Sequence, residues 1–262
     1  MNIVKENMDI EIALAILVEK YGIQTKKTFH LSDNKDDNSL QLMPGNLFEN
    51  GSPGINQIPL LTWRYKRKFT ELKKIVDDAV IQDVCLYRFS QLGDKDKSSL
   101  FSLLYREMDL LEYIGNSKIL SVQAVISDDQ VANVILRLEN NSLGSIEVSS
   151  QMPSGSQMVE RHEIIARRGV TSDLVVDTQI PQSSIYTFTN QGENRYTDVD
   201  NELFGLEDSK IDHVRSAFQV LKNPDLQEKW RQQHHHLCTL VKMVFDSNNN
   251  HKRIFLNHYS EN

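Results

Sequence analysis

The stretch Val131–Ser150, VANVILRLENNSLGSIEVSS, decides the fold. Before the pair Asn140-Asn141, apolar residues alternate with polar ones, and the alternation resumes afterwards through Ile146 and Val148. A period of two is typical of a strand that buries one face, and two adjacent asparagines suit a tight turn. The stretch therefore predicts a β-hairpin in which each strand has a buried side and an open side.

Further strand-like runs lie on both sides of this hairpin, and no helical pattern separates them. They are Ile119–Ile126, Glu160–Arg167, Asp173–Asp177 and Ser184–Thr189. Consecutive strands without crossover helices pair antiparallel. Helical patterns flank the region; the clearest is the apolar stripe from Leu100 to Ile114, which ends at Gly115-Asn116. The sequence thus predicts an α+β fold, with a large, predominantly antiparallel open sheet and helices packed on one face.

The N-terminal part of the chain has a different character. A helix is predicted to follow Asp9, and Gln24–Leu31 could form a strand. Ser32–Pro59 is rich in Asn, Asp, Gly and Pro, which indicates an exposed connection. We therefore divide the chain into 1–60, a helix and strand remnant with a long loop, and 61–262, the sheet domain.

Composition narrows the function. Apolar residues make up 39% of the 262 residues and the net charge is −7, so we expect a folded protein without a nucleic-acid or membrane partner. The basic run Arg64–Lys68 is interpreted as a solvated helix start. Only two cysteines occur, Cys85 and Cys238, which we interpret as buried thiols. Without a disulfide framework or a signal peptide, the chain is predicted to be cytoplasmic.

Working outward from the hairpin, the order of elements resembles a known family. Thr62–Val84, Ser98–Asn116 and the segment HEIIARRGVTSDLVVD at His162–Asp177 are similar to the second half of the glucose–fructose oxidoreductase and inositol dehydrogenase family (Gfo/Idh/MocA). Asn141 and Arg167 stand where that family usually has glycines. The resemblance covers about residues 7–256.

The resemblance implies an N-terminal Rossmann domain that binds NAD or NADP through a G-x-G-x-x-G turn. The 262 residues contain no such motif, because Gly45, Gly51 and Gly54 have the wrong spacing and lie in a polar loop. We therefore expect no cofactor, NAD or NADP being bound only if a partner chain supplies the site.

The family's catalytic positions are also altered. Where relatives carry the Lys of an E-K-P triplet, this chain has Glu6 in Lys5-Glu6-Asn7. In the segment SLLYREMD, Ser102 replaces the family's Asp, and Arg106 replaces the His that acts as general base. A guanidinium stays protonated near neutral pH and cannot take up a proton. The resemblance therefore implies a pseudoenzyme with no catalytic residue.

Other candidate sites have simpler interpretations. Arg106, Glu107 and Asp109 could form a ligand pocket, but Arg106 could also simply pair with a nearby carboxylate. The histidines at 234–236 point in different directions on a helix and do not predict a metal site, and His234 is expected to pack beside Trp230. A further pair, His162 and Glu163, is interpreted as surface residues.

Apolar residues on the predicted open side of the sheet indicate a partner. Val125, Ile135, Val175 and Tyr186 are the candidates, and an exposed apolar sheet face favours pairing with a second copy. The leading hypothesis is a non-catalytic binding or oligomerisation module, a homo-oligomer joined through the sheet. The alternative is an NAD(P)-dependent sugar-type oxidoreductase that uses a cofactor site on a partner subunit, such as a separate Rossmann-domain chain.

Overall fold

The computed structural model describes residues 2–25, 27–31, 39–49, 53–173, 184–190, 192–197, 206 and 208–258. The chain divides into two compact units. The first, the N-terminal unit, comprises Met1–Lys66 and Val199–His236; the second, the sheet unit, comprises Arg67–Asp198 and Leu237–Asn262. Helix α5 (Asp225–Asn250) contributes its first part to the N-terminal unit and its last part to the sheet unit.

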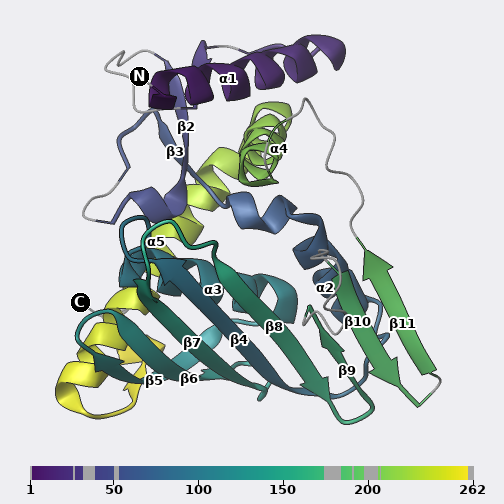
Figure 1. Cartoon of the computed structure of the whole chain (residues 1–262), viewed down its shortest axis with the longest axis vertical. Coiled ribbons are helices and arrows are strands. Elements are labelled where there is room, and N and C mark those ends of the chain that lie inside the picture. Colours follow the sequence, from purple (N-terminus) through teal and green to yellow (C-terminus); the bar gives the residue numbers. More distant parts are fainter. Residues whose placement is uncertain are drawn as a thin grey trace. The chain divides into compact units, whose positions relative to one another are not determined.

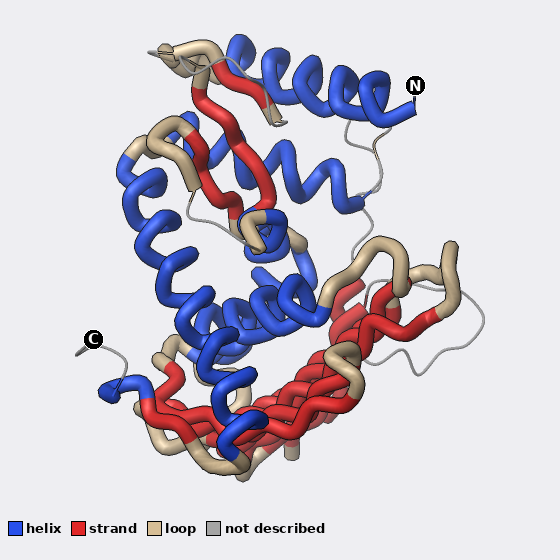
Figure 2. Tube along the Cα trace, turned by 90° about the vertical axis from the view of Figure 1, so that its left-hand side faces the viewer, coloured by secondary structure: helices blue, strands red, loops and turns tan. Residues whose placement is uncertain are grey.

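The sheet unit is built on a nine-stranded sheet with the order β11-β10-β9-β8-β4-β7-β6-β5-β12 (Figure 1). The strands are β4 (Val84–Asp94), β5 (Ile119–Ser127), β6 (Val131–Leu138), β7 (Leu143–Met152), β8 (Val159–Ala166), β9 (Gly169–Ser172), β10 (Ser184–Thr189), β11 (Gly192–Thr197) and β12 (Ile254–Phe255). Every neighbouring pair is antiparallel except β4 with β7. Helices α2 (Arg67–Asp77) and α3 (Leu100–Gly115) lie on one face, which confirms the predicted fold class (Figure 2).

The predicted hairpin is β6 and β7. Asn141 lies in the turn with a φ of 66°, a left-handed conformation that asparagine tolerates and glycine adopts freely. An asparagine can therefore occupy this position of the turn. On β6 the side chains alternate strictly, with Val134 buried and Ile135 exposed. The hairpin therefore has one core side and one open side, as its sequence predicts.

Helix α3 is fixed at both ends by local chemistry. At its start Ser99 and Ser102 form a reciprocal capping box, in which the Ser99 side chain accepts from the Ser102 amide at 3.0 Å. At its end Asn116 adopts a left-handed conformation, with a φ of 50°. Between these ends the helix packs on β4 and β7, and nearly every residue of it is buried. The stripe predicted from Leu100 to Ile114 is confirmed.

Gly144 of β7 leaves room for Leu111 of α3 to pack against the sheet. A Cβ atom at this position would lie 2.5 Å from Leu111 Cδ1 and 3.2 Å from Leu136 Cβ. We expect Gly144→Ala to lower the free energy of unfolding by about 1–3 kcal/mol, because the buried Leu111 side chain must move within a packed core to admit a methyl group. Urea denaturation measures it. Ser145→Ala, on the open side of the same strand, is the control; equal losses in both variants would contradict the prediction.

The prediction of which apolar residues lie exposed on the open face of the sheet is correct in part. Val125 is 70% exposed and Ile135 is 51% exposed, as expected for solvent-side residues. The prediction is wrong for Tyr186, which is buried and whose ring is stacked with that of Phe188 at 6.4 Å. Val175 lies outside the described residues.

The N-terminal unit holds a second, three-stranded sheet in which every pair is parallel, β1-β2-β3. The elements of the N-terminal unit are α1 (Asn2–Lys20), β1 (Phe29–His30), β2 (Leu40–Pro44), η1 (Gly45–Leu47), β3 (Gln57–Leu60), η2 (Thr62–Tyr65), α4 (Asp208–Lys222) and the first part of α5. The exposed connection predicted over 32–59 is therefore wrong where β2 and β3 form. Leu42 and Ile58 are fully buried in these strands. Their short apolar runs are hidden in the sequence by flanking Asn, Gly and Pro.

Two smaller interpretations also change. Cys85, on the outer side of β4, is exposed and donates a hydrogen bond to the Ile165 carbonyl at 3.3 Å, so it is not a buried thiol. Cys238 is partly buried, and burial raises the pKa of its thiol to about 11. Among the residues that the structure describes, no helix is long and apolar enough to cross a membrane.

Candidate functional site: a buried charge cluster

Arg106 lies on the side of α3 that faces the sheet. Its Nη1 donates to Glu107 Oε1 at 3.0 Å, and its Nη2 donates to Glu160 Oε2 on β8. The guanidinium carbon also lies 5.3 Å from the centre of the Phe69 ring. Arg106 is 9% exposed and Glu107 is fully buried. The guanidinium is therefore bound on two sides by carboxylates and stacked against an aromatic ring.

His162 of β8 lies at the centre of the arrangement and is fully buried. Its Nε2 contacts Glu107 Oε2 at 2.9 Å, and its Nδ1 contacts Asp173 Oδ2 at 2.7 Å. Two phenylalanine rings, Phe69 and Phe89, pack edge-on against the imidazole at 4.7 and 4.9 Å. The interpretation of His162 as a surface residue is thus wrong. Its position on the inward side of β8 is the physical reason.

Lys68 of α2 closes the arrangement. Its Nζ lies 2.7 Å from Glu160 Oε1 and 2.7 Å from Asp173 Oδ2. Lys68 is buried, so the prediction of a solvated helix start fails at this residue although α2 does begin at Arg67. The side chain of Asp173 also accepts from the backbone amide of His162. We call these six residues, Lys68, Arg106, Glu107, Glu160, His162 and Asp173, the charge cluster.

The charge cluster neutralises itself. It holds three basic and three acidic side chains, and each basic group touches two of the acids. Burial alone would lower the pKa of His162, but the Asp173 and Glu107 carboxylates outweigh it and raise that pKa. Burial would raise the pKa of Asp173, but His162 and Lys68 lower it to about 2. These interactions favour the charged forms of His162 and Asp173, so the imidazolium and the carboxylate stabilise each other in the buried site.

The candidate site residues that the sequence predicts do not all lie in the charge cluster. Arg106 and Glu107 are brought together, and Arg106 pairs with carboxylates. Asp109 is also fully buried on α3. Ser102 caps that helix: its hydroxyl donates to the Ser99 carbonyl at 2.9 Å, so its role here is local. Glu6 lies in α1 of the N-terminal unit, and its side chain is outside the described residues.

Sequence reasoning missed Lys68, Glu160, His162 and Asp173 as members of one site. Two of them carried a signal that could have been used. Lys68 lies one helical turn before Leu72, on the buried side of α2. His162 shares the inward side of β8 with Ile164. A charged residue on an apolar stripe indicates a buried partner, because an unpaired charge is too costly to bury.

One polar group beside the charge cluster lacks a partner. Gln91 of β4 lies opposite Glu160 in the sheet register, and its Nε2 contacts Met158 Sδ at 2.6 Å. Arg106 Nη1 also approaches this sulfur, at 3.9 Å. Within the described chain, Gln91 Oε1 is a buried acceptor with no hydrogen bond. It is therefore a place where a donor from a ligand would be satisfied.

The described residues do not fit a dinucleotide. In an open α/β sheet such a cofactor binds beyond the carboxyl ends of parallel strands, against the start of a helix. Here β2 runs into the three-residue helix η1, and β3 runs into the four-residue helix η2. Helices this short do not offer a pyrophosphate the amides and dipole of a long helix. No hydride-transfer step follows from these residues.

The three adjacent histidines on α5 do not form a metal site in the described part of the chain. His234 is buried, as predicted, and its ring packs edge-on against Phe48 at 5.7 Å. Burial and the neighbouring His235 lower the pKa of His234 to about 4. Over the described part of the chain, no group of three or more His, Cys, Asp or Glu side chains is arranged to hold a metal ion.

Solved structures of oxidoreductases share this fold. One is an oxidoreductase from Agrobacterium radiobacter in complex with NAD+, L-tartaric acid and magnesium. The match covers 78% of this chain and 66% of the chain of that oxidoreductase, with a TM-score of 0.60 and 11% identity. The match to levoglucosan dehydrogenase in complex with NADH and levoglucosan covers 75% of this chain and 65% of that enzyme's chain, with a TM-score of 0.59 and 14% identity. The match to an inositol dehydrogenase homologue from Azotobacter vinelandii, in complex with NADH and myo-inositol, covers 76% of this chain and 64% of the homologue's chain, with a TM-score of 0.57 and 10% identity.

These likenesses establish the fold as that of the Gfo/Idh/MocA-type oxidoreductases. The chain spans 64–66% of the length of these solved structures. No protein-family model matches the sequence, and no curated protein matches it.

Proposed function

We propose that this chain is a non-catalytic relative of the Gfo/Idh/MocA-type oxidoreductases that acts as a binding and assembly module. The observation that carries the proposal is the self-neutralised charge cluster. The resemblance places the family's general base at Arg106, and here that residue is a guanidinium held by Glu107 and Glu160. A permanently protonated group cannot remove a proton from a hydroxyl.

The other basic groups of the charge cluster do not offer a replacement. His162 is fully buried, and both of its ring nitrogens are bonded to carboxylates that favour the protonated form. A general base needs a free lone pair within reach of the substrate. Lys68 is also buried, and the carboxylates of Glu160 and Asp173 outweigh burial and raise its pKa. The charge cluster therefore supports a structural role for these residues rather than proton transfer.

The binding part of the proposal is placed at the Met158 end of the charge cluster. Met158 is exposed, and it contacts both Gln91 and Arg106. A hydroxylated ligand there could donate to the unpaired Gln91 Oε1 and accept from Arg106. Glu107, fully buried, would hold the guanidinium in place.

The assembly part of the proposal is placed on the open face of the sheet. The apolar residues exposed there include Val125 with Ile135 on β5 and β6, Leu143 on β7, and the directly paired Leu92 and Val159 on β4 and β8. We propose that a second copy of the chain covers this face.

Purified chain should show no oxidation of myo-inositol or levoglucosan with NAD+ or NADP+, measured as absorbance of the reduced cofactor. In the same preparation, a sugar or sugar acid should raise the melting temperature, because a ligand that binds the folded state stabilises it. Gln91→Leu removes the unpaired acceptor and should abolish that rise. Turnover by the recombinant chain would refute the non-catalytic assignment.

A second candidate is an oxidoreductase that completes its site with a cofactor-binding partner. The likeness of its fold to structures that hold NAD+ or NADH favours it. This candidate requires turnover by protein isolated with its native partners and none by the recombinant chain alone.

A further inference from the structure

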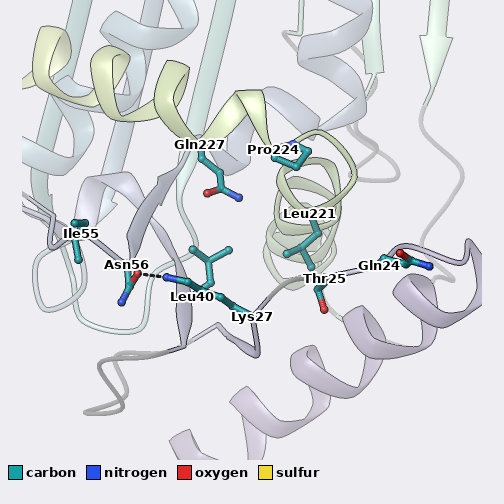
Figure 3. A pocket seen from close by; sticks show the side chains of 9 residues that line it. All are labelled: Gln24, Thr25, Lys27, Leu40, Ile55, Asn56, Leu221, Pro224 and Gln227. Carbon is teal, nitrogen blue, oxygen red and sulfur yellow. Dashed lines mark hydrogen bonds between the residues drawn. The ribbon is translucent and has the colours of Figure 1, made fainter.

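A cavity in the N-terminal unit is lined by none of the residues considered above for catalysis. It has a volume of about 310 Å³, near the lower end of the range for small-molecule sites. Its walls come from the segment after α1, the amino ends of β2 and β3, and the turn between α4 and α5 (Figure 3). The lining residues are Gln24, Thr25, Lys27, Leu40, Ile55, Asn56, Leu221, Pro224 and Gln227.

The position of the cavity separates it from the usual ligand site of an α/β sheet. Leu40 is the first residue of β2, and Asn56 directly precedes β3. The cavity is therefore at the amino edge of the parallel sheet, whereas such sheets bind ligands beyond their carboxyl edge. An inference about this cavity does not rest on the proposed function of the sheet unit.

The cationic side of the cavity is braced. Lys27 Nζ donates to Asn56 Oδ1 at 2.7 Å, and the Asn56 carbonyl accepts from the Gln41 amide of β2 at 2.9 Å. The preceding loop is held by Arg231 of α5, whose guanidinium donates to the carbonyls of Gly54 and Ile55. An ammonium carries three donors, and one of them goes to Asn56. Lys27 is thus positioned with capacity left for an acceptor.

Three further polar side chains of the lining have unused capacity. Gln24, Thr25 and Gln227 make no side-chain hydrogen bond within the described part of the chain. Leu40 and Leu221, both buried, supply an apolar floor. The cavity therefore combines apolar contact area with polar groups that water or a ligand must satisfy, which is the usual composition of a small-molecule site.

The charge of the lining selects the ligand class. Among the nine described residues of the lining, Lys27 is the one with a charge, and none is Asp or Glu. The first turn of α5, next to Pro224, carries Asp225 and Glu228. A doubly charged phosphate would meet a single cation and these two nearby carboxylates, whereas a single carboxylate is matched by Lys27 alone.

We propose that the cavity binds a small organic monocarboxylate. Its carboxylate accepts from Lys27 Nζ, and its apolar body lies on Leu40 and Leu221.

The test uses hydrocinnamate, its neutral amide hydrocinnamamide, and inorganic phosphate as probes of the full chain. Titrations follow the side-chain amide signals of Gln24 and Gln227 by NMR. Hydrocinnamate is expected to shift them saturably at millimolar concentration, and the amide to bind roughly fivefold more weakly, the effect of one exposed charge contact. Equal affinity of acid and amide, tighter binding of phosphate, or no saturable shift would each overturn the proposal.

Variants separate the cavity from general surface effects. Lys27→Met keeps the length of the side chain and should weaken hydrocinnamate roughly fivefold while leaving the amide unchanged. Thr25→Trp fills the cavity from an exposed position and should abolish binding of both. Lys252→Met, another exposed lysine on the chain, is the control and should bind like the wild type. Unchanged binding by Lys27→Met or Thr25→Trp would also overturn the proposal.

Discussion

Replacing Asp173 with asparagine should lower the free energy of unfolding by about 3–5 kcal/mol. The substitution keeps the shape of the side chain but removes one of three negative charges from the charge cluster. Lys68 and His162 each lie 2.7 Å from Asp173 Oδ2 and would share an uncompensated positive charge in a buried site. Breaking a buried ion pair on one side leaves the other side without solvent or partner, which is why the loss is large.

The measurement is urea denaturation at neutral pH. Asp77→Asn is the matched control, because Asp77 Oδ2 lies 3.2 Å from Lys73 Nζ in a partly exposed pair on α2. Such pairs contribute at most about 1 kcal/mol. Adding Lys68→Met to Asp173→Asn restores the charge balance, so the double variant should lose less than the sum of the two single losses. Strictly additive losses would contradict a coupled cluster.

The dependence of stability on pH gives an independent readout of the same charge. The folded-state pKa of Asp173 is about 2, below its ordinary value of 3.8. A depressed carboxyl pKa contributes stability above the unfolded value, and this contribution is lost as the pH falls from about 4 towards 2. The wild type should therefore lose more stability over this window than Asp173→Asn does. Parallel pH profiles would show that Asp173 acts through packing alone.

The parts of the fold that the sequence predicts are those in which the signal is local. The alternation along Val131–Leu138 directly follows the buried and open sides of β6. The stripe of α3 and its capping residues are likewise contained within one element. Strands β2 and β3 were missed because each is only four or five residues long and is flanked by polar residues. Their burial depends on a parallel pairing that no local pattern reveals.

The candidate site could be predicted only in part, for a related reason. Arg106 and Glu107 are neighbours in the chain, and pairing of Arg106 with a carboxylate was one of the two alternatives considered. Lys68 and Asp173 lie 105 positions apart, and His162 and Glu107 lie 55 apart. Nothing in a single sequence brings such residues together. Their inward positions on α2 and β8 were readable, but the identity of their partners required the structure.

Replacing Ile135 with glutamate should convert the proposed dimer into a monomer. Ile135 is 51% exposed on the open face and lies diagonally from Val125 on the neighbouring strand. A two-fold interface uses the same patch on both copies, so one substitution introduces two charges. Burying a charge without a partner costs several kcal/mol, which corresponds to at least roughly a 100-fold weaker dimer.

Sedimentation velocity at micromolar concentration measures the change. Ile12→Glu is the matched control, because Ile12 is 53% exposed on α1 of the N-terminal unit and the substitution makes the same chemical change outside the sheet unit. Both variants should melt like the wild type in dilute solution, since a glutamate on an exposed position stays hydrated. A monomeric wild type, or a dimer that survives Ile135→Glu, would contradict assembly through the sheet. Dissociation by Ile12→Glu alone would place the contact on α1 instead, because only there would the added charge be buried.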